Sequence, residues 1–174
     1  MSKARTSRLS CELTQEGINN LIKELELYKT DRLKSATQDL VRRLGELGAS
    51  FVQQHIRSCG AIDTYELFNK IKVEEKDFGN VLAVYIIADS DHAVFVEFGT
   101  GQKGAGAPYP YPLPEGVSWE YNQRGTDGWL YPADDGTWRY TEGQPARPFM
   151  YPASKDITKI VPKIAREVFK KYYG

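Results

Sequence analysis

Four side chains that can exchange protons or hold a cation lie close together in the middle of the sequence: Asp89, Asp91, His92 and Glu97. Carboxylates beside a histidine are the residue types of general acid–base catalysis, so a small hydrolase using Asp91, His92 and Glu97 is one hypothesis. Asp89 and Asp91 have a simpler interpretation, because aspartates accept hydrogen bonds from the free N–H groups at a helix start. We therefore expect them to cap a short helix over residues 93–98, and we favour a protein that is not an enzyme.

Two other patterns have the residue types of a binding site without its spacing. His55 and Cys59 lie four residues apart on one face of a predicted helix, but no second pair of ligands follows at a spacing that would complete a zinc site. The run Gly99-Thr-Gly-Gln-Lys-Gly104 is glycine-rich like a phosphate-binding loop, but it lacks the closing Gly-Lys-Ser/Thr. The sequence therefore predicts no catalytic residue, no metal and no cofactor.

The elements around these residues are those of a single α+β domain spanning residues 1–174. Residues 1–12 are expected to form a flexible arm. Apolar residues at helical spacing predict a long helix over 14–58, with a kink or break at Lys29-Thr-Asp31 and a stop at Cys59-Gly60.

A small antiparallel sheet and a terminal helix follow from the same patterns. Residues 67–73 and 81–88 are rich in β-branched and aromatic side chains and predict a hairpin. An amphipathic helix is predicted from an N-cap at Ser154 to Tyr172, and Pro162 should bend it.

Residues 102–141 are predicted to form an insertion rich in proline and aromatic residues. Four prolines within 108–114 favour an extended surface loop, and a proline-binding or proline-presenting adaptor acting through these residues is a further hypothesis. A strand is predicted over 117–121, and an Asp-Gly turn at 135–136 predicts a hairpin that brings Trp129 and Trp138 together.

The aromatic side chains of this insertion suggest a contact surface. Strand alternation sends half of them outward, and exposed tryptophans are typical anchors of protein interfaces. The alternative is a private small core beneath the loop. The candidate interface residues in the insertion are Trp119, Trp129 and Trp138.

Composition and charge exclude several classes of protein. Hydrophobic residues make up 41% and charged residues 26% of the 174, which is typical of a globular chain, and the longest apolar run, 81–88, is far too short to span a membrane. The net charge is zero, whereas a protein that coats nucleic acid carries a basic excess. Cys11 and Cys59 form no disulfide framework, and no apolar segment follows the basic start, so we expect no secretory signal and a reducing cytosol.

The charge is unevenly distributed along the chain. Residues 1–60 hold 10 basic and 7 acidic side chains, residues 61–146 hold 6 and 14, and residues 147–174 hold 7 and 2. The three parts therefore carry net charges of +3, −8 and +5. This polarity suits head-to-tail contact between copies.

The most specific segments are Ala93-Val-Phe-Val-Glu-Phe-Gly-Thr-Gly101 and Gly143-Gln-Pro-Ala-Arg-Pro-Phe-Met-Tyr-Pro-Ala153. Placed between a leading helix with a hairpin and a terminal helix, they resemble the minor neck, or head–tail joining, proteins of long-tailed bacteriophages and prophages. Phe95 stands where that family often has tyrosine, and Tyr65 stands where it usually has the glycine of a turn. The residues that carry the resemblance are Glu97, Phe98, Gly99, Thr100, Pro145, Ala146, Arg147, Pro148 and Phe149.

The resemblance implies a structural virion protein that bridges the head connector to the tail around the DNA channel. Its expected partners are further copies in a six- or twelve-fold ring, a head-connector or head-closure protein, and a tail-terminator or tail-tube protein. Viral DNA would pass through the channel without sequence-specific binding. The uneven charge described above suits an acidic lumen that does not grip the DNA. The protein would reside in the virion neck or tail and assemble in the host cytoplasm, away from membranes. The alternative within this setting is a tail-terminator protein that caps the tail tube.

Several residue roles follow from local chemistry. Glu97 and Arg147 are isolated charges in apolar runs, so we expect them to pair, within one subunit or across an interface, unless each is separately solvated. Prolines should hold residues 145–152 extended, with Phe149 and Met150 anchored in the core and Arg147 at an interface. The long helix should contact other subunits, with Phe51 among the contact residues.

Overall fold

The computed structural model describes residues 15–62, 65–79, 81–122, 127–133 and 135–173. The expected arm, residues 1–12, lies outside these ranges. The elements, in chain order, are α1 (Gln15–Ser58), α2 (Glu66–Asn69), β1 (Ile71–Asp77), β2 (Leu82–Ala88), α3 (Ala93–Phe98), α4 (Gly101–Gly106), β3 (Trp129–Pro132), β4 (Trp138–Thr141), β5 (Gly143–Gln144) and α5 (Met150–Tyr173).

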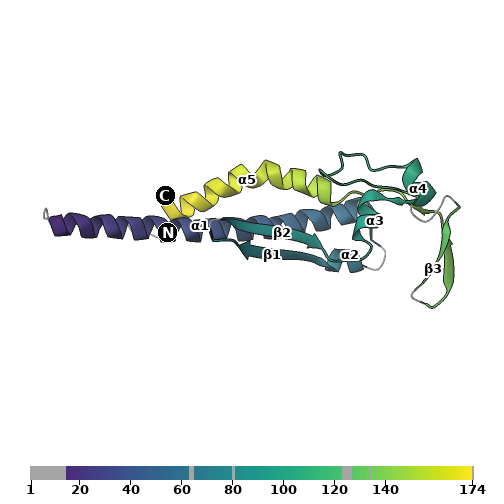
Figure 1. The fold of residues 1–174 in the computed structure, drawn as a ribbon, viewed down its shortest axis with the longest axis horizontal. Coiled ribbons are helices and arrows are strands. Elements are labelled where there is room, and N and C mark those ends of the chain that lie inside the picture. The colour runs from purple at the N-terminus through teal and green to yellow at the C-terminus, as the bar shows by residue number, and fades with distance from the viewer. Residues whose placement is uncertain (1–14, 63–64, 80, 123–126, 134, 174) are drawn as a thin grey trace.

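The molecule is a rod built on α1 (Figure 1). The β1–β2 hairpin lies along one side of α1 and α5 lies along the other, while α2, α3, α4 and the β3–β4 hairpin gather at the end where α1 finishes. The N-terminal part of α1 extends beyond both neighbours at the opposite end. The predicted α+β class, with a long first helix, small antiparallel sheets and a terminal helix, is confirmed.

The long helix α1 is unbroken, so the kink predicted at Lys29-Thr-Asp31 is wrong. The hydroxyl of Thr30 donates a 2.9 Å hydrogen bond to the carbonyl of Glu26, which satisfies it inside the helix. The predicted stop is confirmed, because α1 ends at Ser58 and Gly60 has a φ of 67°.

Two glycines of α1 let the neighbouring elements approach closely. A Cβ at Gly45 would lie 2.6 Å from Val84 Cγ2 and 2.7 Å from Val73 Cγ1 of the hairpin. A Cβ at Gly48 would lie 2.5 Å from Ile157 Cδ1 of α5. Side chains of both neighbours therefore fill the space that a larger residue on α1 would occupy.

The buried core lies where α1, α2, α3 and the start of α5 meet. Its members are Val52, Ile56, Leu67, Ala93, Phe149 and Ala153. Met150 packs against it, as expected for the proline-flanked segment. Phe51, which we expected at a subunit interface, is also partly buried against this core, so the structure gives it an intramolecular role.

Tyr65 adopts the backbone conformation of a glycine. Its φ is 62°, the only positive φ outside glycine among the described residues. This is the left-handed region, which glycine adopts most readily. A left-handed non-glycine residue costs about 1–2 kcal/mol.

The first hairpin is shifted relative to the prediction. The segment 67–69 belongs to α2, and β1 begins only at Ile71. β1 continues to Asp77, past the predicted end of the strand at residue 73, whereas β2 spans Leu82–Ala88, close to the predicted 81–88. Phe78 N–H donates to the Val81 carbonyl at 2.9 Å where the two strands join. All seven residues of β1 pair antiparallel with β2.

The insertion differs from the prediction at three points. Residues 101–106 form α4 instead of beginning an extended loop, and 117–121 form no strand. The β3–β4 hairpin is present, but its register pairs Trp129 with Thr141 and Pro132 with Trp138. The two tryptophans therefore lie at opposite ends and on opposite faces of the hairpin, so the predicted proximity is wrong.

The terminal helix starts earlier than predicted. It begins at Met150, and Ser154 lies inside it and donates to the carbonyl of Tyr151 at 2.7 Å. Pro162 lies within the helix, and α5 arches along the rod as expected (Figure 1). The side chain of Ser154 therefore does not cap the N-terminus of α5.

Candidate functional site

The two specific segments of the sequence lie directly against each other. We call residues 143–149 the strap. Its Arg147 N–H donates a 2.8 Å hydrogen bond to the carbonyl of Val96 in α3. Thr100 forms a β-bridge with Gln144, so the strap runs antiparallel to the chain that leaves α3. The residues that carry the family resemblance thus form one structural unit.

Glycine is required where the strap crosses this chain. Gly99 has a φ of 81°, and a Cβ placed on it would lie 2.6 Å from the backbone nitrogen of Ala146. A larger residue would be strained by its backbone and would also push the strap away. Gly101 and Gly143, which bridge to each other, have φ values of 63° and 89°.

Glu97 is the centre of this unit. Its side chain is buried, with 5% of the residue exposed. Carboxylate oxygen Oε2 accepts the backbone N–H of Phe149 at 2.7 Å and of Met150 at 2.9 Å. Oxygen Oε1 accepts the N–H of Tyr151 and the hydroxyl of Tyr109, both at 3.2 Å. Two hydrogen bonds to each oxygen compensate for burying the charge.

These bonds satisfy every free backbone N–H group at the N-terminus of α5. The first turn of a helix leaves its N–H groups without partners inside the helix. For α5 these are the N–H groups of Phe149, Met150 and Tyr151, all accepted by Glu97, and the next residue, Pro152, has none. The negative charge also lies at the positive end of the helix dipole. Glu97 is therefore the cap of α5, supplied from 53 residues before Met150 in the sequence.

Aromatic side chains cover the capped carboxylate. Burial, and next the nearby charge of Glu97, raise the pKa of the Tyr109 hydroxyl far above its usual range, so it remains a donor. The Tyr109 N–H in turn donates to the hydroxyl of Tyr121 at 2.9 Å. The ring of Tyr109 packs edge-on against Phe98, with centroids 4.8 Å apart. Sequence reasoning missed Tyr109, whose only signal was the alternation of tyrosine with proline.

Trp119 belongs to the same cover. Its indole N–H donates a 2.9 Å hydrogen bond to the carbonyl of Gly99, and its ring lies 5.1 Å from that of Phe98 and 6.0 Å from that of Phe95. We expected Trp119 on a strand and at an interface. The structure places it instead in the small core beneath the loop, the alternative considered for these aromatics.

Arg147 does not pair with Glu97 inside the subunit. The four hydrogen bonds of the carboxylate go to backbone N–H groups and Tyr109, and the described residues contain no ion pair between Glu97 and Arg147. The backbone carbonyl of Arg147 lies 3.8 Å from Cys59 Sγ. The part of the hypothesis that placed the pair in one subunit is therefore corrected.

The candidate catalytic and metal residues are not assembled into a site. The hydrogen bonds of Glu97 leave it facing the strap, whereas Asp91 and His92 are exposed at the start of α3. His55 Nε2 lies 3.0 Å from Asp156 Oδ2, away from the contacts of Cys59. Within the described ranges, no group of three or more potential ligands could hold a metal ion.

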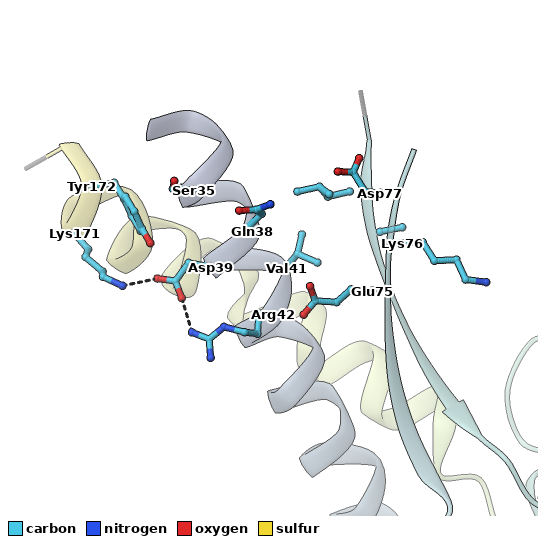
Figure 2. Close-up of a pocket in the computed structure, with 12 residues that line it drawn as sticks. Ser35, Gln38, Asp39, Val41, Arg42, Glu75, Lys76, Asp77, Lys171 and Tyr172 are labelled. Carbon is cyan, nitrogen blue, oxygen red and sulfur yellow. Dashed lines mark hydrogen bonds and ion pairs between the residues drawn. The ribbon is translucent and has the colours of Figure 1, made fainter. Parts of the chain in front are cut away.

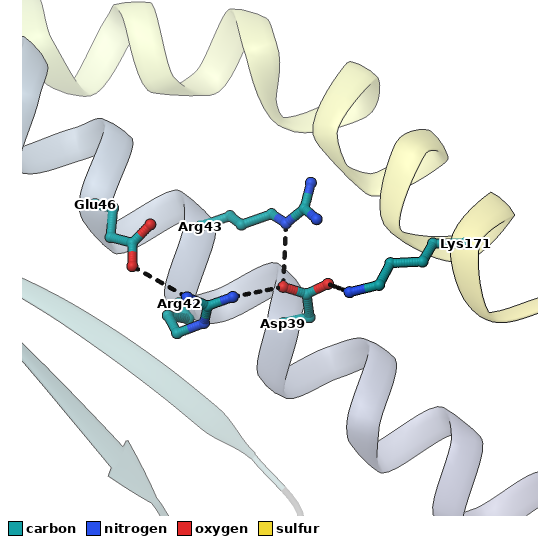
Figure 3. A network of polar contacts seen from close by, with 5 residues as sticks. All are labelled: Asp39, Arg42, Arg43, Glu46 and Lys171. Atoms are coloured by element: carbon teal, nitrogen blue, oxygen red, sulfur yellow. Dashed lines mark hydrogen bonds and ion pairs between the residues drawn. The ribbon is translucent and has the colours of Figure 1, made fainter. Parts of the chain in front are cut away.

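A charged cluster joins α1 to the last turns of α5 (Figure 3). Asp39 is buried and binds three cations: Lys171 Nζ at 2.9 Å, Arg42 Nη2 at 3.0 Å and Arg43 Nε at 3.1 Å. Arg32 Nη1 adds a 2.9 Å hydrogen bond to the carbonyl of Tyr172. Cations thus lie at the C-terminal end of α5, and the anionic Glu97 lies at its N-terminal end. The helix dipole favours both placements. The spacing of Asp39 to Arg42 and Arg43 was a sequence signal for this cluster.

The cluster borders an open hollow of about 480 Å³ between α1, the tip of the β1–β2 hairpin and the end of α5 (Figure 2). Its described lining holds neither histidine nor cysteine, and its buried carboxylate, Asp39, already binds Lys171 and Arg42.

Asp39 should make stability depend on pH in the acid range. Its cations, Lys171 first, lower its pKa from 3.8 to about 2 against the opposing effect of burial. Because the folded-state pKa is depressed, the stabilisation is complete above the unfolded value and disappears as the pH falls toward about 2. In chemical denaturation, wild type and Asp39→Asn should differ most above pH 5 and converge near pH 2. A difference independent of pH would contradict the role of the carboxylate charge, and Lys171→Gln should reproduce most of the effect.

Both ends of the rod expose apolar side chains. In the β3–β4 hairpin, Leu130 and Trp138 share one face and are 59% and 69% exposed, while Trp129 on the other face is half-buried. In the extending part of α1, Ile18, Ile22 and Leu25 follow helical spacing and are also exposed. The expected apolar excess of the long helix thus lies in its N-terminal part.

Comparisons of the chain with protein-family models, with curated proteins and with solved structures found no match. Among the described residues, no helix has the length and apolar character needed to cross a membrane.

Proposed function

We propose that the chain is a non-enzymatic structural subunit of the neck of a long-tailed bacteriophage or prophage particle. In this role, copies form a ring of six or twelve that bridges a head-connector or head-closure protein to a tail-terminator or tail-tube protein. DNA passes through the ring. The protein belongs to the virion and assembles in the host cytoplasm.

The observation that carries the proposal is the rod with uncovered apolar surface at both ends. Trp138 on the distal hairpin and Ile22 on α1 are large apolar side chains that are 69% and 48% exposed. A subunit whose two ends differ can associate head-to-tail, and such contacts close into rings. Exposed tryptophan and leucine on one hairpin face suit docking on a second protein.

The resemblance of the sequence adds support of a different kind. Its two segments, around Glu97 and around Phe149, form the capped strap junction, so the residues that define the resemblance are those that fix the terminal helix. The presence of these residues is therefore explained by their structural role, without a catalytic one. The remaining choice, between a neck ring and a tail terminator, depends on the neighbours in the particle.

Deletion of the gene from its phage or prophage, followed by electron microscopy of the products, tests the proposal. A neck protein leaves filled heads and finished tails that do not join, whereas loss of a terminator gives tails of uncontrolled length. Complementation with Leu130→Ser/Trp138→Ser should fail to restore joining although the purified variant melts like wild type. Tyr131→Ser, on the other hairpin face, is the matched control. Normal infectious particles in the deletion would overturn the proposal.

A further inference from the structure

Five exposed cations lie along the solvent-facing side of α5. All of the following are exposed: Lys155, Lys159, Lys163, Arg166 and Lys170. Their spacing of four, four, three and four residues places them on one side of a helix. We call these five residues the basic stripe.

The basic stripe lies opposite the packed face of the helix. At 100° per residue, its five members fall within an arc of about 80°, centred about half a turn from the buried residues Ala153 and Val168. The two acidic residues of α5 lie outside this arc, and one of them, Asp156, turns toward His55 of α1 at 3.0 Å. The charged residues in the arc itself are therefore all cations, and the arc is flanked on one side by Asp156, which pairs with Lys159 at 2.8 Å, and by the exposed Glu167.

The local contacts of the stripe leave its charge at the surface. Lys155 lies over the ring of Tyr151 at 4.9 Å, Lys159 Nζ lies 2.8 Å from Asp156, and Arg166 Nε donates to the carbonyl of Pro162 at 3.0 Å. All these partners belong to α5 itself. In Figure 1, α5 forms an outer edge of the rod, so a partner can approach it along its length.

The composition of the stripe favours a phosphate backbone over a protein partner. Four of its five members are lysines, which are depleted at protein interfaces and act as point charges toward phosphate. No aliphatic anchor lies within the arc. The one aromatic residue of α5 at the edge of the arc is Tyr173, whose ring stacks on that of Phe169 with centroids 5.9 Å apart. The stripe therefore offers no series of rings on which single-stranded bases could stack. A membrane surface would need the apolar face of α5, which packs on α1.

We propose that the basic stripe contacts the phosphate backbone of double-stranded DNA without reading its sequence. From Lys155 to Lys170 it extends about 22 Å, over which one strand of a duplex presents about six phosphates. The inference deepens the proposed function, on which its biological setting rests, by naming the surface that meets the DNA. It also departs from the expected acidic lumen that does not grip DNA, because it assigns DNA contact to a basic helix face.

The experiment measures binding of the full chain to a fluorescent duplex of about 30 base pairs of arbitrary sequence, across a series of salt concentrations. Five phosphate contacts predict that the logarithm of affinity falls with the logarithm of salt with a slope of about −4.5. The variant Lys155→Gln/Lys163→Gln/Lys170→Gln should bind at least about tenfold more weakly at low salt, with a slope of about −1.8.

The control carries the same change in net charge on another element. Lys23→Gln/Lys29→Gln/Lys34→Gln removes three exposed cations of α1 and should leave affinity within about twofold. Equal losses in both variants, no binding by wild type at low salt, or tighter binding of a single strand would each overturn the proposal. So would loss of self-association, measured by sedimentation, in the stripe variant alone, because the stripe would then be a subunit contact. None of these results depends on particle assembly, so this inference and the proposed function can fail separately.

Discussion

Phe149→Ala is expected to lower the free energy of unfolding by about 3–5 kcal/mol. The Phe149 side chain is 1% exposed and lies in the core with Val52 and Ile56 of α1 and Leu67 of α2. Truncation removes the burial of a large ring and leaves a cavity between the strap, α1 and α2. Because small domains are stable by only about 5–15 kcal/mol, the loss should be evident in urea denaturation and in the melting temperature.

Arg147→Ala is the matched comparison, two residues earlier in the same strap. Its backbone N–H still donates to Val96, so the monomer should lose less than about 1 kcal/mol. Phe149→Leu fills most of the volume and gives a smaller loss that stays measurable if Phe149→Ala does not fold. Comparable losses for Arg147→Ala and Phe149→Ala would show that the Arg147 side chain belongs to the subunit core, which would remove it from the candidate interface residues.

The elements that the sequence predicted best are those fixed by periodic apolar residues. The stripes of α1 and α5 and the β-branched run of β2 each bury one side against a neighbour, so their pattern and their structure have the same cause. A short helix with its apolar residues within 93–98 was also predicted, and α3 spans these residues, but the N–H groups at its start receive no side-chain cap from Asp89 or Asp91. Asp89 instead pairs with Lys72 of β1.

The errors occurred where a contact distant in sequence replaced a local signal. Ser154 looked like an N-cap, but a serine inside a helix can bond to the preceding turn instead, and Glu97 supplies the cap. Val117 to Tyr121 has strand-like residues, but Trp119 and Tyr121 are held by the chain after α3 and by the loop before them. Tertiary bonds of this kind have no local pattern in a single sequence.

The candidate site was predicted in its residues but not in its arrangement. Glu97 and Arg147 were identified as charges that need partners, and pairing them was the simplest solution for two opposite charges. The structure uses the backbone instead, because three N–H groups at a helix start bind one carboxylate as well as a cation would and also fix the direction of the helix.

Glu97→Gln is expected to lower the free energy of unfolding by about 3 kcal/mol, although the side chain keeps its shape. An amide has one acceptor oxygen, so whichever way it is oriented, its NH₂ group faces N–H donors of the α5 terminus. At least one backbone N–H then stays buried without a partner, at about 1–3 kcal/mol, and the favourable interaction of the charge with the helix dipole is lost as well. Glu97→Ala should lose more, since all three N–H groups of the first turn become unpaired.

The location of the effect distinguishes a helix cap from a general core contact. Hydrogen exchange should accelerate first at the N–H groups of Phe149, Met150 and Tyr151 in Glu97→Gln, because these groups lose their acceptor while the remainder of α5 stays packed on α1. Glu120→Gln, which neutralises an exposed carboxylate, is the control and should change stability by less than about 0.5 kcal/mol. Unchanged exchange at the three N–H groups, together with wild-type stability, would refute the capping role. The terminal helix, and the basic stripe on its outer face, would then have to be oriented by the strap alone.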